Sequence, residues 1–250
     1  MLLLISTFQI SNILLILILF FLFFKIAESK WSYKISKPYS WEAAIKNKII
    51  SKELKRIEQR YHDKVRFYNF WFQVERLKKQ RVEGAFAELG VYKGETAKML
   101  HLMDKSRKLH LFDTFSGFND SDLTKENNNE EKYNVSNFAD TNIDAVKNFI
   151  GETEQLFYHV GYFPDTTKDL VEDKFALVHL DADLYQPTIT ALNYFYPKLS
   201  SGGVIIIHDY NHTWPGVVKA VDEFILIAKE NIIPIPDWQG SVMIIKNNKF

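Results

Sequence analysis

The sequence predicts an α/β protein built on a doubly wound, mostly parallel sheet of seven strands. Three observations favour this fold class. From Gly84 onward, short apolar runs of strand length alternate with segments of helix length, which is the pattern of repeated β-α-β units. Most connections between these segments are short, as they are in compact α/β domains. Two of the apolar runs end in groups of ionisable residues, and the carboxyl edge of an open α/β sheet is where ligands bind.

The predicted elements alternate along the whole C-terminal part of the chain. The strands lie at residues 85–89, 108–112, 156–160, 175–180, 204–207, 232–235 and 242–245, and helices lie at 95–103, after Asp183, at 143–150 and at 215–229. Pro236 separates the last two strands, which we expect to pair in antiparallel fashion. Residues 117–141 are polar and acidic and show no period. A loop of that length inside a compact domain is usually functional or disordered.

Two helices are predicted ahead of the sheet, and together they form a helical cap over residues 41–81. The first runs from Trp41 to about Tyr61, with Ser40 as its N-cap. The second covers residues 64–80 and carries a stripe of aromatic side chains. Such a stripe at helical spacing predicts packing rather than contact with a cofactor.

The N-terminal residues 1–24 carry no charged side chain and are mostly apolar. At about 1.5 Å per residue, a helix of this length crosses a hydrocarbon core of roughly 30 Å. We therefore predict a transmembrane anchor over residues 1–24. A cleaved signal peptide is the alternative. It fits less well because no basic segment precedes the apolar run and no clear cleavage site follows it.

The residues that follow the predicted anchor are basic. Residues 25–40 are expected to form a basic linker that is extended from Trp31 onward. The lysines just after the apolar run are Lys25, Lys30, Lys34 and Lys37. Because no basic residue precedes the run, the positive-inside rule predicts a single-pass membrane protein with its C-terminal domain in the cytoplasm. The basic segment would also attract anionic lipid headgroups.

Formal charges cancel over the whole chain but are unevenly distributed. Residues 25–81 hold 16 Lys or Arg against 6 Asp or Glu, a net charge of +10, whereas residues 82–250 hold 15 against 25, a net charge of −10. The chain has no cysteine, which excludes a disulfide framework, a zinc–thiolate site and a cysteine nucleophile. No nucleic-acid partner is predicted, and formation of a homo-oligomer is left open.

Residues at the ends of the first two predicted strands favour a nucleoside cofactor that carries a positive charge. Glu88 lies at the end of the first strand, Gly90 lets the backbone approach a ligand closely, and Gly94 opens the following helix. An acid at position 88 suits an ammonium or a hydroxyl better than a pyrophosphate, which needs N–H donors. Asp113 ends the next strand, where a doubly wound fold places the acid that binds ribose hydroxyls. Together these acids indicate S-adenosylmethionine rather than NAD.

Four ionisable residues follow two later strands that we expect to be parallel neighbours. Asp181 and Asp183 come after one strand, and His208 and Asp209 come after the next. Because a helix joins these strands, their carboxyl ends meet at the same edge of the sheet. Asp181, His208 and Asp209 are therefore predicted metal ligands; the carboxylates suit Mg²⁺, and His208 as a ligand favours Mn²⁺ or another transition ion. Alternatively, Asp183 caps the next helix and His208 acts as a base or bonds to a neighbour.

Six blocks of sequence, in this order and spacing, are similar to a known family. They read ELGVYKGETA, LFDTFSGF, GYFPDTT, LDADLYQPT, GGVIIIHDYNHTWPG and KAVDEF. Over residues 84–246 the chain resembles the macrocin O-methyltransferase family. The resemblance implies a Rossmann-like class I methyltransferase domain over residues 82–250, dependent on S-adenosylmethionine and a divalent cation and acting on sugar hydroxyls.

The resemblance also implies roles for single residues. It implies that Glu88 and Gly90 contact the methionine end of the cofactor and that Asp113 holds the ribose. It implies that Asp181 is a metal ligand and that the pair at 208–209 supplies the rest. The family usually has Asp-Asp-Tyr at this pair, where this chain has His-Asp-Tyr. The identity of the metal is therefore left open between Mg²⁺ and Mn²⁺.

We expect a membrane-anchored O-methyltransferase for a sugar hydroxyl, acting on a lipid-linked or nascent surface glycan at the cytoplasmic face. Asp183 and His212 are the candidates for the base, and Asp183 is favoured because it leaves the same strand end as Asp181. Two alternatives remain: a catechol-type small-molecule O-methyltransferase, and an inactive scaffold that binds S-adenosylmethionine. An NAD-dependent epimerase is disfavoured because the chain has no G-x-G-x-x-G.

Overall fold

The computed structural model describes residues 6–124, 126, 133–170 and 174–247. The chain divides into two compact units, of which the first ends at Ile50 and the second begins at Ser51. Each unit is described by itself, because their relative placement is not determined. The second unit carries the sheet that the sequence predicts.

The first unit consists of helices α1 (Thr7–Ser36) and α2 (Tyr39–Lys46). A capping box starts α1: the Ser6 hydroxyl accepts the N–H of Gln9, and the Gln9 side chain accepts the N–H of Ser6. The expected extended linker from Trp31 is wrong as far as Ser36, because the helix continues through it. It ends just before Pro38, since a residue that precedes proline is disfavoured in the helical region.

The helix predicted over residues 41–61 is two helices. After α2, Lys48 adopts a left-handed backbone conformation with φ 59°, and the chain starts again as α3 (Lys52–Arg60). The hydroxyl of Ser51 accepts the N–H of Leu54 at 3.1 Å and caps this new helix. The predicted N-cap was therefore misplaced: Pro38 precedes α2, and Ser51 is the serine that caps the second of these two helices.

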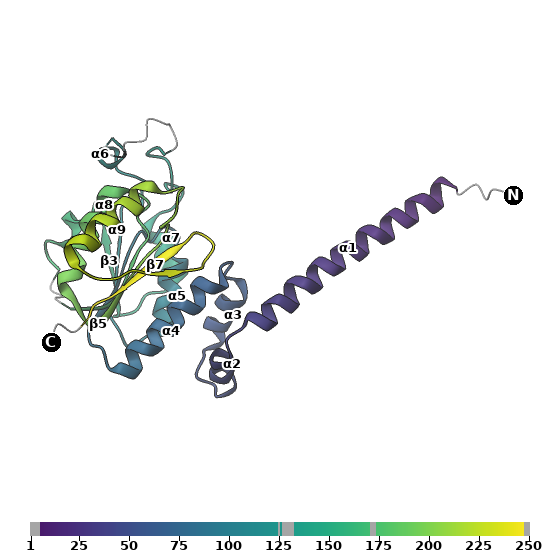
Figure 1. Ribbon diagram of the computed structural model, residues 1–250, viewed down its shortest axis with the longest axis horizontal. Helices are drawn as coiled ribbons and strands as arrows, with labels where there is room; N and C mark the ends of the chain where they lie inside the picture. The colour runs from purple at the N-terminus through teal and green to yellow at the C-terminus, as the bar shows by residue number, and fades with distance from the viewer. Residues whose placement is uncertain (1–5, 125, 127–132, 171–173, 248–250) are drawn as a thin grey trace. The chain divides into compact units, whose positions relative to one another are not determined.

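The second unit contains a seven-stranded mixed sheet with strand order β3-β2-β1-β4-β5-β7-β6 (Figure 1). The strands are β1 (Ala85–Leu89), β2 (Leu109–Asp113), β3 (Leu156–Val160), β4 (Phe175–Leu180), β5 (Leu199–Ile207), β6 (Ile233–Ile235) and β7 (Ser241–Ile245). The first five are parallel, while β7 runs antiparallel to both β5 and β6. The predicted strands are confirmed within a few residues, and β5 begins earlier than expected.

Helices cover both faces of this sheet. The helices after α3 are α4 (Lys64–Gln80), α5 (Glu95–Met103), α6 (Asp120–Leu123), α7 (Ile143–Ile150), α8 (Tyr185–Lys198) and α9 (Pro215–Ala228), with a 3₁₀ turn at Asp165–Thr167; α6 lies beyond the end of the sheet (Figure 1). Helices α8 and α9 pack side by side on one face (Figure 1). The short helix α6 lies inside the predicted aperiodic segment 117–141, so that segment is not wholly irregular.

Alternation along the strands decides which side chains face which helices. Ala85, Ala87 and Leu89 of β1 belong to the apolar core that includes residues of α8 and α9. Because successive side chains of a strand point to opposite faces, Glu88 points to the other face. The same alternation in β4 sends Val178 into that core and His179 to the face of Glu88. The sheet therefore turns one acid and one histidine toward α4.

Candidate functional site

A cavity of about 280 Å³ lies at the carboxyl ends of β1, β2, β4 and β5. This is the edge at which doubly wound sheets bind ligands. Of the residues predicted for the site, those that line it are Gly90, Asp113, Asp181, Asp183, His208 and Asp209. Glu88, Gly94 and His212 are not among its lining residues. The structure thus gathers most, but not all, of the predicted site.

Gly90 is required by the packing of the strand ends. Its φ is +87°, and a Cβ built on it would lie 1.9 Å from the carbonyl oxygen of Asp181. No other residue fits there without moving the backbone of β1 or β4. This requirement holds with or without a ligand, so the glycine alone is not evidence of cofactor binding.

Gly94 has a different surrounding. It is the N-cap of α5, with φ +83°. A Cβ there would meet the side chains of Ile150 at 3.0 Å and Val146 at 3.1 Å, both on α7. The close contact between α5 and α7 therefore explains why position 94 is a glycine.

Asp113 ties the end of β2 to the loop that follows β1. Its Oδ2 accepts the N–H groups of Val91 at 2.7 Å and Tyr92 at 2.8 Å, and its Oδ1 accepts the N–H of Phe115 at 2.6 Å. An ionised carboxylate offers about four acceptor positions. Three are used here, which leaves capacity for a hydroxyl in the cavity that Asp113 lines.

We predict that Asp113→Asn lowers the free energy of unfolding by about 1–3 kcal/mol, because in either orientation its amide NH₂ faces at least one backbone N–H donor. The control is Asp140→Asn, which removes an exposed ion pair with Lys93 and should change stability little. Urea titrations of the two variants measure the difference. Equal stability of Asp113→Asn and the wild type would contradict this role.

Glu88 is buried and pairs with a histidine that sequence reasoning missed. The β1–β4 register places Glu88 opposite His179, and Oε1 of Glu88 lies 2.8 Å from Nδ1 of His179. Burial and the charge of Asp181 raise the pKa of Glu88 well above its usual range, while burial and the charge of Arg66 lower the pKa of His179. Oε2 of Glu88 is buried without a hydrogen-bond partner in the described part of the chain.

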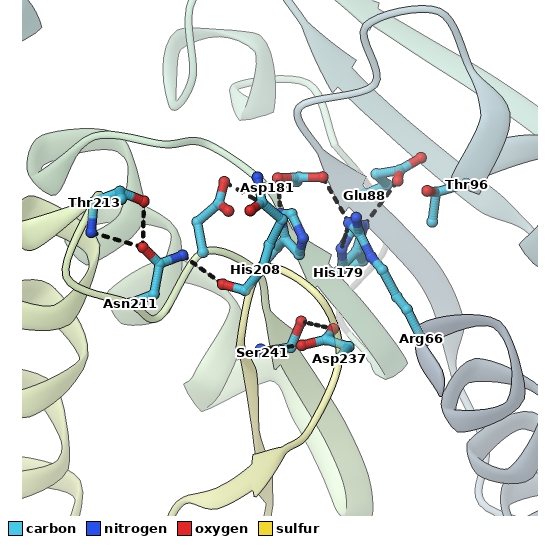
Figure 2. Close-up of polar contacts among 12 residues, drawn as sticks. Arg66, Glu88, Thr96, His179, Asp181, His208, Asn211, Thr213, Asp237 and Ser241 are labelled. Carbon is cyan, nitrogen blue, oxygen red and sulfur yellow. Dashed lines mark hydrogen bonds and ion pairs between the residues drawn. The ribbon is translucent and has the colours of Figure 1, made fainter. Parts of the chain in front are cut away.

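Arg66 of α4 is the second residue that sequence reasoning missed. Its Nη2 lies 2.8 Å from Oδ2 of Asp181 and 3.2 Å from Nε2 of His179 (Figure 2). A polar residue inside an apolar strand was a signal for His179. For Arg66 the only signal was its position one helical turn before Phe70, on the same face of the helix. The ring of Phe70 packs edge-on against His179, with 4.9 Å between the ring centroids.

Asp181, His208 and Asp209 form a compact set of possible metal ligands, with ligand atoms all within 4.8 Å of one another. Nδ1 of His208 lies 2.8 Å from Oδ1 of Asp181 (Figure 2). The same nitrogen lies 3.2 Å from Oδ2 of Asp209. Burial alone would raise the pKa of Asp181, but the charges of His208 and Arg66 outweigh it and hold this pKa well below its usual range. Burial lowers the pKa of His208, yet Asp181 raises it to about 9.

These residues fit a divalent cation. Two carboxylates and an imidazole are ligands that Mn²⁺ and related ions accept. Oδ1 of Asp209 is buried and has no hydrogen-bond partner among the described residues, and a bound cation would satisfy it. His208 already bonds to both carboxylates through Nδ1, so it would have to give up these bonds to act as a ligand through that atom.

The two candidates for the base lie in different places. Asp183 lines the cavity beside Asp181 and Asp209. Burial, followed by the charges of these two neighbours, raises the pKa of Asp183 well above its usual range, which makes it a stronger base. His212 is exposed and does not line the cavity. Of the two candidates, Asp183 lines the cavity and His212 does not, so Asp183 stays the predicted base.

Part of the segment 117–141 closes one side of the cavity. Phe118, Asp122 and Phe138 line it, as does Trp214. Asp122 is buried and accepts a hydrogen bond from the hydroxyl of Tyr162 at 2.7 Å. Sequence reasoning described this segment as a polar, acidic and aperiodic loop of a kind that is usually functional or disordered, and it did not single out Asp122.

A mostly parallel sheet of this order with acids at its carboxyl edge defines a Rossmann-like, class I methyltransferase fold. The family model of macrocin O-methyltransferase (TylF) matches residues 47–240. The chain therefore belongs to the macrocin O-methyltransferase family, which assigns it to the S-adenosylmethionine-dependent O-methyltransferases.

Named relatives are similar over part of their length. The chain is 28% identical over 172 residues to mycinamicin III 3''-O-methyltransferase of Micromonospora griseorubida, covering 64% of this chain and 67% of the relative. It is 27% identical over 156 residues to a rhamnosyl-tetracenomycin-C 4'-O-methyltransferase of Streptomyces olivaceus, covering 58% and 60%. It is 39% identical over 71 residues to demethyldecarbamoylnovobiocin O-methyltransferase of Streptomyces niveus, covering 28% and only 27%.

Solved structures share the fold. The O-methyltransferase NovP superposes with a TM-score of 0.62 at 24% identity, over 74% of this chain and 81% of that one. The calicheamicin methyltransferase CalS11 superposes with a TM-score of 0.56 at 18% identity, over 84% and 87%. At these identities the likeness concerns the fold alone.

Proposed function

We propose that this protein transfers the methyl group of S-adenosylmethionine to a sugar hydroxyl with the help of a divalent cation. One observation carries the proposal: Asp113, Asp181, Asp183 and Asp209 line a single cavity at the carboxyl edge of a sheet from this family. A relative named for 4'-O-methylation of a rhamnosyl compound supports a sugar as the acceptor.

The roles follow from where the acids lie. Asp113 holds the ribose hydroxyls with its remaining acceptor capacity, and Gly90 borders the methionine end. The family resemblance assigns Glu88 to the methionine end as well, although Glu88 is buried and does not line the cavity. A bound divalent ion would lower the pKa of the acceptor hydroxyl, which is otherwise a poor nucleophile near neutral pH. Asp181 and Asp209 would hold that ion together with His208. Asp183 takes the proton from the hydroxyl as the methyl group leaves the sulfonium, so no charge accumulates on the sugar.

The lining of the cavity supports this choice of ligands. Its acidic members are Asp113, Asp122, Asp181, Asp183 and Asp209, and no Lys or Arg occurs among its described lining residues. Such a site attracts a sulfonium and a metal ion and disfavours an anionic group next to the reacting hydroxyl. Phe118, Phe138 and Trp214 add apolar faces, against which the C–H groups of a sugar ring can pack.

We predict that Asp181→Asn loses most methyl transfer, about 100-fold or more, because it removes a charged ligand from the metal set. Binding of S-adenosylhomocysteine should change little, since the cofactor is held at the ends of β1 and β2. The assay measures labelled methyl transfer to glycolipid extracts after chelation and after return of Mg²⁺ or Mn²⁺. Full activity of the wild type in chelator would remove the metal from the proposal.

His208→Asp tests the departure from the family pattern. The change restores paired carboxylates, so it should shift the preference from Mn²⁺ toward Mg²⁺, the ion that prefers oxygen ligands. Activity and direct metal binding are measured side by side in the wild type and the variant. The same preference in both proteins would mean that His208 only bonds to Asp181 and Asp209 and does not coordinate the ion.

The helix α1 supports a membrane anchor. Residues Thr7–Lys30 form a helix long and apolar enough to cross a bilayer, and the described side chains of this stretch are exposed. A contiguous exposed apolar surface of this kind needs a cover, which a bilayer supplies. We place the catalytic unit in the cytoplasm because the lysines follow the span. A signal sequence near the N-terminus would satisfy the same length and composition.

We predict that external protease leaves the catalytic unit whole in intact cells and in right-side-out vesicles, because residues 25–250 face the cytoplasm. The same protease should digest that unit once detergent opens the vesicles. A C-terminal tag follows the fragments on a blot. Digestion in intact vesicles would reverse the orientation, whereas a shortened protein in the soluble fraction would identify a cleaved signal sequence.

Two other functions remain as outcomes of the methyl-transfer assay. Transfer to catechols but not to sugars would identify a small-molecule O-methyltransferase of the same fold. Binding of S-adenosylhomocysteine without turnover on either class, with and without metal, would identify an inactive scaffold.

A further inference from the structure

A single nitrogen atom of Arg66 contacts both Asp181, a proposed metal ligand, and His179, the partner of Glu88. We propose that Arg66 is a positioning residue for methyl transfer, which fixes Asp181 directly and Glu88 through His179. This inference rests on the proposed function for the roles of the two carboxylates. It adds a residue from α4, whereas the proposed metal ligands and base follow the ends of β4 and β5.

The bonding capacity of Nη2 determines the arrangement. This nitrogen carries two hydrogens, and its two contacts, to Asp181 Oδ2 at 2.8 Å and to His179 Nε2 at 3.2 Å, use both. A guanidinium only donates, so Nε2 of His179 must accept. The ring proton of a neutral His179 then lies on Nδ1, 2.8 Å from Oε1 of Glu88, to which it donates. Arg66 thus sets the tautomer that orients Glu88.

Asp181 is held at both of its oxygens. Oδ2 accepts from Arg66, and Oδ1 accepts from Nδ1 of His208 at 2.8 Å. The side chains of Arg66 and Asp181 are 14% and 25% exposed, so water screens their attraction little. A continuous row of hydrogen bonds therefore runs from Glu88 to Asp181 and on to His208 (Figure 2).

The start of α4 is itself fixed, which keeps Arg66 in place. Oδ1 of Asp63 accepts the backbone N–H of Arg66 at 2.9 Å and caps the helix. Oδ2 of Asp63 accepts the N–H of Trp238 at 2.6 Å. One turn later, the ring of Phe70 packs against His179. The helix therefore presents a pre-organised guanidinium to the two side chains that it orients.

Loss of Arg66 should affect the orientation of Asp181 and of Glu88 at once. Oδ2 of Asp181 and Nε2 of His179 would each lose their donor, and Asp181 could turn toward His208 alone. His179 could then move its proton to the other nitrogen and stop donating to Glu88. A residue that merely stabilises the fold would not change the tautomer of one histidine.

The test compares Arg66→Met, Arg66→Lys and a matched control, Arg76→Met, in the full-length chain in detergent micelles. Arg76 lies on the same helix and also loses several hydrogen bonds on substitution, among them one to the carbonyl of Gly202 at 2.7 Å. Three quantities are measured: kcat for methyl transfer, the affinity for S-adenosylhomocysteine, and the side-chain ¹⁵N signals of His179 after labelling of histidine.

We expect Arg66→Met to lower kcat about 100-fold and to weaken S-adenosylhomocysteine binding several-fold, in the range of other supporting residues of active sites. The His179 signals should change from a protonated Nδ1 to a mixture of tautomers. Arg66→Lys should recover part of each loss, because an ammonium can donate to both partners but lacks the planar reach of a guanidinium. Arg76→Met should lower the melting temperature and leave the other quantities near those of the wild type.

A folded Arg66→Met variant with the wild-type kcat and unchanged His179 signals would overturn the proposal. Equal losses of kcat in Arg66→Met and Arg76→Met, at equal loss of stability, would also overturn it. The proposed function fails separately, when the wild type transfers no methyl group to any acceptor. The cofactor affinity and the tautomer of His179 still test Arg66 in that case.

Discussion

The pairing of β1 with β4 is the constraint on which the site depends. Its register sets Glu88 beside His179, and Gly90 lies against the backbone of Asp181 so closely that a Cβ would overlap its carbonyl oxygen. A shift by one residue would turn every side chain of either strand to the opposite face. The pairing of β1 with β4 therefore fixes the positions of Glu88 and Asp181 before any ligand binds.

The acids at the carboxyl edge of the sheet concentrate negative charge in the cavity, and few cationic side chains of the described residues lie near them. Arg66 and His208 each touch Asp181. Asp183 hydrogen-bonds to Asp209, and Oδ1 of Asp209 is buried without a hydrogen-bond partner among the described residues. Buried charges that stay unpaired are costly. The protein alone leaves the cavity short of positive charge, and the sulfonium and the metal ion of the proposed reaction would supply it.

Sequence reasoning reached the parts of the site that topology fixes. Asp113 and Asp181 lie at strand ends, and parallel strands bring such ends to one edge whatever their loops do. It could not reach Arg66, because the contact with Asp181 spans 115 positions and depends on how α4 packs on the sheet. It also joined α2 and α3 into one helix. A serine such as Ser51 can lie on the exposed face of a continuous helix, so its role as the N-cap of α3 was not recognised.

The second ionisable residue after β4 and the second after β5 share an unusual backbone conformation. Asp183 and Asp209 both adopt left-handed conformations, with φ of 61° and 60°. Such conformations are uncommon for residues other than glycine, although aspartate tolerates them better than most. Tyr92 and Phe138, which also line the cavity, share this backbone region. Strained residues persist where the surrounding structure over-determines them. Here the sharp turns after β4 and β5 place a carboxylate at the cavity, and Leu184 rather than Asp183 is the N-cap of α8.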